Sequence, residues 1–360
     1  MQKDHGWAHS ARSNATDARA EEQQRRQPGL VDLQVNGFAG FDVNADDVDV
    51  DTIVELTHAM WAEGVTTYLP TVITADEEKI LHVLAVIAEA RRSDRLLAHS
   101  IAGIHVEGPA LAKEDGPRGA HDVRHLRDPD PAELERWQHV SGGLVRIVTL
   151  APERARASEY IAAAVAVGVR ISLGHCSPSP EQVRYAVDAG ATLSTHLGNG
   201  VHQMIARHPN HLWAQLAEDR LTAMLIADGH HLPPDTLTVM IRAKSPSRCV
   251  LTSDSAALAG MPAGEYDTPV GGRVEVSDDG RLTLVGTSLL AGSGASLRDC
   301  LEWAIENLPF SPCELLAMAT TNPARLIGVS DRVVEGGDSV LLEGGRVVTT
   351  TVAGTELHHA

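Results

Sequence analysis

The feature that most constrains the fold of this chain is an alternation of short β-rich runs with amphipathic, Ala-rich stretches from Pro28 onward. Each run is rich in Val, Ile, Leu or Thr and ends in Gly or polar residues, which is the pattern of β-α units. Eight such units predict an α/β fold, a (β/α)8 TIM-type barrel, with an open doubly wound sheet as the alternative. The runs span residues 30–35, 65–72, 101–108, 145–152, 169–176, 192–199, 222–229 and 249–256, and the helices are expected at 52–62, 76–91, 157–167, 180–189, 233–243, 296–307 and 312–319.

Composition and charge exclude several classes of partner. Hydrophobic residues make up 43% of the chain, and no apolar run approaches the roughly 20 residues that a membrane span needs. A net charge of -18 disfavours nucleic acid and anionic membranes, which are bound through clustered Lys and Arg. We therefore expect a soluble protein with no nucleic-acid or membrane partner.

The cysteines and the first residues bear on location and domain boundaries. Cys176, Cys249, Cys300 and Cys313 lie far apart without a C-x-x-C pair, which argues against a disulfide framework and favours the cytoplasm. Residues 1–27 contain no apolar signal-peptide core, and we interpret them as a disordered leader or an expression remnant.

The first run, VDLQVNG, has an alternating pattern. Val31, Leu33 and Val35 alternate with polar residues, which predicts one apolar and one polar strand face. Chemically capable residues also stand near the C-terminal ends of the later runs. In a barrel these ends converge at one mouth, whereas an open sheet would spread them along a line. The polar residues of the first run are Asp32, Gln34 and Asn36, and the residues near the C-terminal strand ends are Gln34, Asn36, Glu107, His175, His196, Asp228 and Asp254.

Three of these residues are of the types that hold a catalytic metal. Glu107, His175 and His196 offer one carboxylate and two imidazoles, a set that leaves a coordination position open for water. A single His at a strand end is more often structural, but three suitable ligands at one mouth favour a metal site. Asp254 is either a helix N-cap or turn aspartate, or the general base beside that metal.

Eight segments carry a resemblance to a known family. They occur in order from about Pro28 to about Gly337, and they resemble the N-acetylglucosamine-6-phosphate deacetylases of the amidohydrolase superfamily. The resemblance implies a metal-dependent barrel that hydrolyses the acetamido group of an amino sugar phosphate to acetate and an amine. The segments are PGLVDLQVNG, GIHVEGP, SLGHCSP, STHLGNG, IADGHHLP, LTSDSAALAG, LLAGS and TTNPARLIG.

The resemblance also assigns roles to individual residues. It implies that Glu107, His175 and His196 bind the metal, that Asp254 is the catalytic acid and base, and that His121 contacts the acetyl carbonyl. Gln34 and Asn36 stand where related enzymes have H-x-H for a second metal. Since neutral amides are poor ligands for zinc or iron, we expect a vestigial second position and one divalent ion per chain, zinc or iron(II).

Substrate binding is implied at three further positions. The resemblance places Asn199, Arg207 and His231 at the substrate, the last two at its phosphate, and implies a homodimer in which Arg207 reaches the neighbouring subunit's site. The loop THLGNGVHQM departs from the family's T-H-L-Y-N-A-M, because it lacks the aromatic residue and has two glycines. We therefore expect a wider or reshaped pocket, and a different, non-phosphorylated acylated amine is the alternative substrate.

Two other kinds of function fit these residues less well than a metal-dependent deacetylase. A deaminase or cyclic amidase would commonly retain H-x-H or a carboxylated Lys, and a catalytically silent barrel would not need every ligand and Asp254.

The C-terminal segment SVLLEGGRVVTTTVAG is typical of a hairpin with an EGG turn. We expect a catalytic barrel over residues 28–328 and a reduced β-sandwich lobe over residues 329–360.

Overall fold

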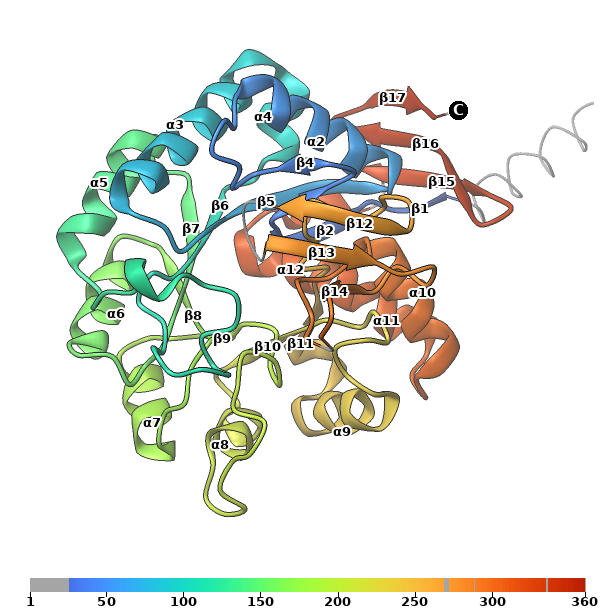
Figure 1. The fold of residues 1–360 in the computed structure, drawn as a ribbon. Helices are drawn as coiled ribbons and strands as arrows, with labels where there is room; N and C mark the ends of the chain where they lie inside the picture. Colours follow the sequence, from blue (N-terminus) through green and yellow to red (C-terminus); the bar gives the residue numbers. More distant parts are fainter. Residues whose placement is uncertain (1–25, 269–271, 288, 335, 360) are drawn as a thin grey trace, which may run out of the picture.

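Eight parallel strands form the centre of the molecule. The structure, a computed structural model, describes residues 26–268, 272–287, 289–334 and 336–359. Each strand pairs in parallel with the next, and a bridge between Val35 and Ser255 brings the two ends of the sheet together. The sheet is thus a nearly closed barrel, which confirms the predicted fold (Figure 1). The strands are β2 (Leu30–Val35), β5 (Val65–Ile73), β6 (Ile104–Glu107), β7 (Val145–Leu150), β8 (Arg170–Leu173), β9 (Leu193–Ser194), β10 (Thr222–Leu225) and β11 (Cys249–Leu251).

Helices surround this barrel, and several begin at strong sequence signals. Ser179, Ser296 and Ser311 each form a capping box that satisfies free N–H groups of the first turn. The seven predicted helices are present, and α4, α5, α8 and α12 were not predicted. The helices are α2 (Val50–Ala62), α3 (Glu77–Ser93), α4 (Arg95–Ser100), α5 (Pro131–Ser141), α6 (Ala157–Ala166), α7 (Pro180–Asp188), α8 (His211–Ala217), α9 (Pro234–Lys244), α10 (Leu297–Asn307), α11 (Pro312–Ala319) and α12 (Thr321–Ile327). None of the described helices is long and apolar enough to cross a membrane.

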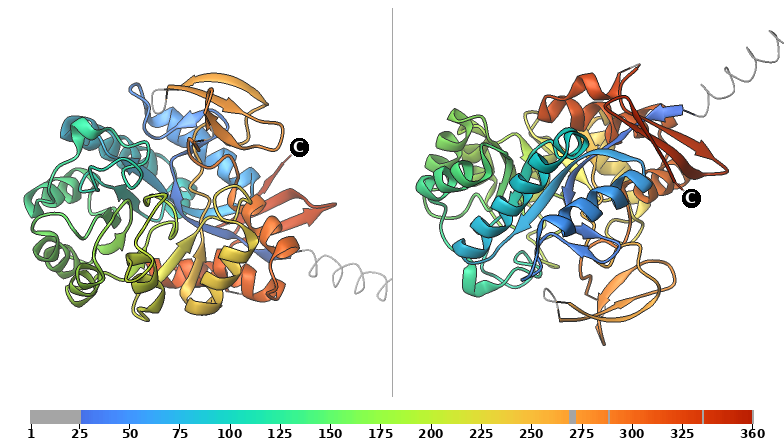
Figure 2. Two further views of the ribbon diagram at one scale, coloured as in Figure 1. Left: turned by 60° about the horizontal axis from the view of Figure 1, so that its bottom comes forward. Right: turned by 90° about the horizontal axis from the view of Figure 1, so that it is seen from above.

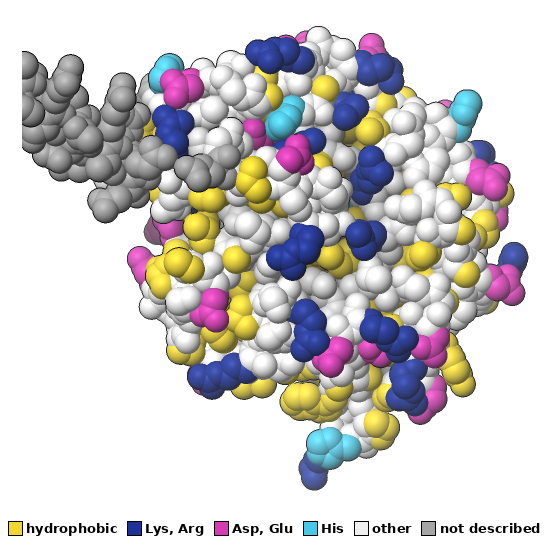
Figure 3. Space-filling model, turned by 180° about the vertical axis from the view of Figure 1, so that it is seen from behind, with side chains coloured by type: hydrophobic (Ala, Val, Ile, Leu, Met, Phe, Trp, Pro, Cys, Tyr) yellow, Lys and Arg dark blue, Asp and Glu magenta, His cyan; other side chains and the backbone are white. Residues whose placement is uncertain are grey.

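An apolar layer fills one end of the barrel. Its side chains come from six of the eight barrel strands and are fully buried, and Ala324 of α12 packs against them. Burying one such side chain contributes about 1.5–3 kcal/mol, so this layer stabilises the barrel. Its strand residues are Val31, Leu33, Leu69, Ile147, Leu193, Met224 and Val250. Figure 3 shows the molecular surface at this end, where Lys and Arg side chains gather across the middle.

Strand β2 does not keep the simple alternation that its sequence predicts. All six of its residues are buried, and its pairing with β5 is irregular between Asp32 and Val35. Asp32 accepts hydrogen bonds from the Thr252 hydroxyl at 2.7 Å and from the Ser253 amide at 3.2 Å. Asp32 therefore joins the first and last strands of the barrel, while Gln34 and Asn36 continue toward the mouth.

The opposite end of the barrel, its mouth, is partly covered by a small sheet that the sequence analysis missed. This antiparallel sheet consists of β12 (Gly264–Thr268), β13 (Gly272–Val276) and β14 (Leu282–Leu284), between β11 and α10. Val274, Val276 and Leu282 pack on Leu258. Figure 2 shows this sheet on the side of the molecule opposite to α12. A short hairpin, β3 (Gly37–Phe38) with β4 (Phe41–Asp42), follows β2.

A second antiparallel sheet lies beside the barrel. Its order is β1 (Arg26–Pro28), β15 (Ser339–Glu343), β16 (Arg346–Val352) and β17 (Thr355–His358). The predicted C-terminal hairpin is present as β15 and β16, and the Thr350 hydroxyl donates to the Trp61 carbonyl at 2.6 Å. Arg26 and Gln27, which we assigned to the leader, instead pair with β15 because their backbone completes this sheet. The rest of that leader, residues 1–25, lies outside the described residues.

Candidate active site

Three potential metal ligands meet at the mouth of the barrel. Glu107 is the last residue of β6, while His175 and His196 each stand two residues beyond β8 and β9. Glu107 Oε1 lies 3.4 Å from His175 Nε2 and 3.2 Å from His196 Nε2, and the two Nε2 atoms are 3.1 Å apart. Ligands at zinc bond lengths in a tetrahedron lie about 3.3–3.4 Å apart. The donor set and its spacing therefore fit one divalent ion.

The backbone turns these residues toward one another. His175, His196 and Asp254 have φ values of 48°, 26° and 50°, in the left-handed region that L residues rarely adopt. Such residues cost about 1–3 kcal/mol each and persist where function requires the geometry. A Cβ atom on Gly200 would lie 2.8 Å from His175 Nδ1, so glycine leaves room for this ring.

One hydrogen bond fixes the tautomer of the His175 ring. His175 Nδ1 lies 2.8 Å from the carbonyl oxygen of Pro117. Since a carbonyl only accepts, Nδ1 carries the proton, and the lone pair of Nε2 would be available to a bound ion.

Burial and the neighbouring side chains shift the pKa values of the acidic and basic groups in the cluster. Burial raises the pKa of Glu107, but the facing His175 and His196 outweigh this effect and hold that pKa well below its usual range. Burial lowers the pKa of His196, but the hydrogen bond to Glu107 leaves it raised overall. Burial lowers the pKa of His121 to about 3, so that its ring is neutral at neutral pH.

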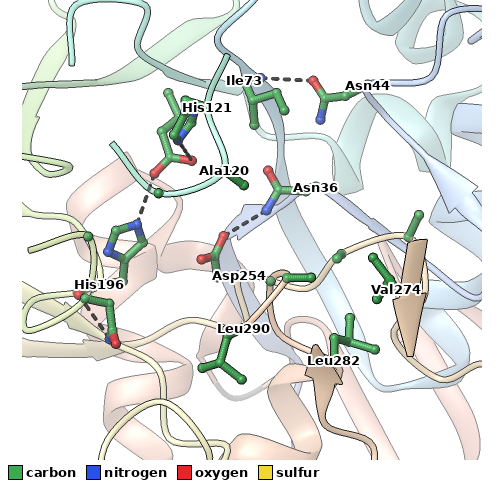
Figure 4. Close-up of a pocket in the computed structure, with 18 of the residues that line it drawn as sticks. Asn36, Asn44, Ile73, Ala120, His121, His196, Asp254, Val274, Leu282 and Leu290 are labelled. Carbon is green, nitrogen blue, oxygen red and sulfur yellow. Dashed lines mark hydrogen bonds and ion pairs between the residues drawn. The ribbon is translucent and has the colours of Figure 1, made fainter. Parts of the chain in front are cut away.

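The two amides of the first strand face the two carboxylates of the site. Gln34 Nε2 donates to Glu107 Oε1 at 3.0 Å. Asn36 Nδ2 donates to Asp254 Oδ1 at 2.8 Å (Figure 4). Burial raises the pKa of Asp254 to about 6, although His196 and the Asn36 hydrogen bond lower it. The amide oxygens of Gln34 and Asn36 are buried and accept no hydrogen bond from the described residues.

His121 stands over the cluster from the loop after β6. Its Nε2 lies 3.7 Å from Glu107 Oε2, and its ring meets that of His175 edge-on with centroids 4.4 Å apart. Its Nδ1 is buried and finds no partner in the described part of the chain. A neutral imidazole with a free nitrogen at this place can donate to a substrate oxygen.

The cavity beside these residues has a polar floor and an apolar wall. Asn199 and His231, both expected at the substrate, line it. Arg207 does not line it, because it lies on an exposed part of the loop before α8. In Figure 4, Val274, Leu282 and Leu290 form a wall on the Asp254 side. The sequence analysis missed this wall, since its short strands fall outside the β-α rhythm and only their alternation between glycines could have revealed them.

The glycine-rich loop does not widen the cavity at its first glycine. A Cβ atom on Gly198 would lie 2.9 Å from Met240 Cε and 3.1 Å from Leu232 Cδ2. Side chains of α9 and of the segment before it therefore occupy the space toward which a side chain at this position would point.

Comparisons with known proteins agree with this geometry. A model of the Amidohydrolase family matches residues 27–334. The N-acetylglucosamine-6-phosphate deacetylase of Bos taurus is 35% identical over 85% of this chain and 75% of its own. The N-acetylgalactosamine-6-phosphate deacetylase of Escherichia coli O157:H7 is 34% identical over 84% of this chain and 78% of its own.

Solved structures show the same relationship. The N-acetyl-D-glucosamine-6-phosphate deacetylase of Mycobacterium smegmatis, in complex with N-acetyl-D-glucosamine-6-phosphate, matches with a TM-score of 0.82 and 31% identity. The match covers 92% of this chain and 86% of that one. The chain therefore belongs to the amidohydrolase family, in its N-acetylglucosamine-6-phosphate deacetylase branch, and is a metal-dependent hydrolase of amide bonds.

Proposed function

We propose that this hydrolase removes the acetyl group of an N-acetylated amino sugar 6-phosphate, of the N-acetylglucosamine or N-acetylgalactosamine type. The products are acetate and the amino sugar phosphate. The observation that carries the proposal is the meeting of Glu107, His175, His196, His121 and Asp254 at one cavity, in a chain whose relatives bear these substrates in their names.

Glu107, His175 and His196 would hold the divalent ion. When bound there, such an ion lowers the pKa of a water molecule and polarises the amide carbonyl. The neutral His121 donates a hydrogen bond to the acetyl oxygen, on which charge develops in the transition state.

Asp254 moves the proton. Its raised pKa of about 6 suits a group that first accepts a proton from water and then gives it to the departing amine. Asn36 holds one oxygen of this carboxylate, which leaves the other for proton transfer. No nucleophilic side chain is required, and burial raises the pKa of the neighbouring Cys176 thiol well above its usual value.

We assign one divalent ion per chain, zinc or iron(II). Support comes from Gln34 and Asn36, whose N–H groups point at the Glu107 and Asp254 carboxylates, where a second ion would need ligands. Neutral amides are poor ligands for zinc or iron compared with imidazole or carboxylate, and these two direct N–H groups, which repel a cation, into that space.

The phosphate group requires positive charge, and the described residues that line the cavity include no Lys or Arg. His231, the other residue expected at the phosphate, does line the cavity. We assign Arg207, which is exposed on the loop before α8, to the phosphate site of a second copy of the chain. There its guanidinium group would form two parallel hydrogen bonds to the phosphate. This assignment requires a homodimer. We place it in the cytoplasm, since the cysteines of the described residues are all free.

A substrate panel tests the proposal. Acetate release is measured with the zinc- and iron(II)-loaded enzyme on both N-acetylhexosamine 6-phosphates and on the corresponding plain sugars, with Asp254→Asn as the control. Turnover that favours one or both phosphates supports the proposal. Equal turnover of plain and phosphorylated sugars would support amide hydrolysis but refute the recognition of a phosphate group. No acetate from any of these sugars would refute the substrate class.

A further inference from the structure

Asp228 is a polar strand-end residue that the proposed chemistry leaves unused. It follows β10 at the mouth of the barrel and is nearly fully buried. Its Oδ2 lies 2.6 Å from His231 Nδ1, and its Oδ1 accepts the backbone N–H groups of His230 and His231 at 2.9 Å each. One carboxylate thus binds both the ring and the backbone of His231, which lines the cavity.

A third element joins the same carboxylate. The Ser293 hydroxyl donates to Asp228 Oδ2 at 3.4 Å, and the Ser293 amide reaches the carbonyl of Asp254 at 3.4 Å. The backbone at Gly229 has a φ of 79°, and a Cβ atom there would lie 2.5 Å from Trp303 Nε1, so that the turn between Asp228 and His231 is tightly packed. These contacts connect the substrate-binding His231 with the segment of the acid and base.

The contacts favour an ionised Asp228. Burial raises its pKa, but the His231 ring and the two backbone N–H groups outweigh burial and lower it to about 2. A charged acceptor makes stronger hydrogen bonds than a neutral one. The His231 ring is consequently held with Nδ1–H directed at Asp228, and its Nε2 is the nitrogen left for a ligand.

We propose that Asp228 is a positioning residue for substrate binding: it fixes the ring of His231 so that Nε2 faces the cavity, where the anionic group of the substrate is bound. This inference rests on the proposed function, because it takes the substrate to be a sugar phosphate. Asp228 is outside the group of possible metal ligands, and its shortest contact is with the His231 ring, so that we expect its effect on substrate binding to pass through His231.

Kinetics of variants test the inference. Asp228→Asn keeps an oxygen for the two backbone N–H groups but places an NH2 group against Nδ1, which removes the acceptor. We expect KM for the phosphorylated sugar to rise by about 10- to 100-fold, the range of effect seen when the partner of a metal-binding imidazole is removed, with kcat nearly unchanged. In a His231→Ala background, Asp228→Asn should raise KM no further.

A matched control comes from the opposite end of the barrel. Asp338 is also buried and lies 2.7 Å from His99 Nε2, so Asp338→Asn removes a similar Asp–His pair outside the cavity. This variant should lower the melting temperature without changing KM. If Asp228→Asn raises KM equally with and without His231, or leaves KM unchanged, the inference is wrong.

A second measurement needs no variant at Asp228. Nitrogen NMR of histidine-labelled, metal-loaded enzyme, with the His231 signals assigned by their loss in His231→Ala, reports which ring nitrogen carries the proton. A protonated Nδ1 supports the inference, and an unprotonated Nδ1 overturns it even if Asp228→Asn does not fold. A wild type that does not prefer phosphorylated sugars would refute the proposed phosphate recognition instead, a result that the substrate panel shows separately.

Discussion

The two ends of the barrel are built from the same strands but differ in what those strands contribute. Toward α12 the interior is apolar, and Leu33, Leu69 and Met224 are completely buried there. Toward β12–β14 the strands end in carboxylates, imidazoles and amides. Within single strands such as β2 and β5, the residues therefore change from packing residues to site residues along the chain.

The two ends also differ in how their polar groups are satisfied. At the closed end, Asp338 bonds to His99 and to the amide of Ala353, and Arg332 donates to Thr67. At the mouth, buried atoms of Gln34, Asn36, His121 and His196 have no partner among the described residues. Buried polar groups normally find partners. Atoms without a partner also occur elsewhere in the described chain, but at the mouth they stand beside the possible metal ligands, where a bound ligand would satisfy them.

The largest effect should follow removal of the metal, which acts only on the mouth. A chelator should abolish amide hydrolysis while the chain stays folded, because the apolar layer of the closed end contains no ligand. Adding back one equivalent of zinc or iron(II) should restore activity. Elemental analysis after gel filtration checks the stoichiometry, and two retained equivalents per chain would refute the single site.

The next largest effect should come from Asp254→Asn. Loss of a general acid and base lowers turnover by roughly 10² to 10⁴, and the metal should remain because Asp254 is outside the ligand triad. Turnover and metal content are measured on the same sample. Metal loss with an intact fold would make Asp254 a ligand, and unchanged turnover would remove it from the site.

The sequence predicted the eight strands and the site residues at their ends for one physical reason. In a barrel, the C-terminal ends of the strands and the residues just beyond them meet at a common mouth, so that Glu107, His175 and His196 could be grouped without knowing any distance. The helices α4, α8 and α12 were missed because six or seven residues are too few to show helical periodicity. For α5 the signal was present, as Asp130 caps a helix that begins with Pro131.

Other features depend on contacts between distant segments. The turn of Asp32 toward β11 requires an irregular pairing of β2 that no local pattern shows. Likewise, the absent aromatic residue at Gly198 suggested an open space that Met240 and Leu232 in fact occupy.

A packing variant at the closed end should produce the opposite pattern to Asp254→Asn. Leu69 on β5 is completely buried in the apolar layer, and Leu69→Ala should lower the free energy of unfolding by about 2–5 kcal/mol. The metal content and kcat of the folded fraction should stay the same. Denaturant titration and kinetics well below the unfolding midpoint are the two measurements. A fall in kcat without a loss of stability would show that the two ends are not independent.

A smaller effect is expected for Arg207→Ala, which tests whether the mouth is completed by a second copy. We expect KM for the phosphorylated sugar to rise by about 10- to 100-fold, which corresponds to the loss of a charged hydrogen bond, with no change on the plain sugar. Arg156, exposed and paired with Glu159, provides the control variant Arg156→Ala. Mixing Arg207→Ala with an Asp254→Asn chain should leave some sites intact, and a protein that sediments as a monomer would contradict the assignment.

The smallest effect is expected in the pH dependence of kcat/KM and in how the variant Asn36→Ala changes it. Asp254 must be ionised to accept a proton, and burial raises its pKa to about 6. The value of kcat/KM should therefore fall as the pH falls through this pKa, and a bound divalent ion, which favours the ionised carboxylate, should place the midpoint at or below that value. Asn36 donates to the ionised form, so Asn36→Ala should raise the pKa of Asp254 and move the acidic limb upward by about one pH unit. Profiles of kcat/KM for both enzymes on the phosphorylated sugar provide the measurement. A limb that stays in place, or moves to lower pH, would show that Asn36 does not stabilise the charge of Asp254.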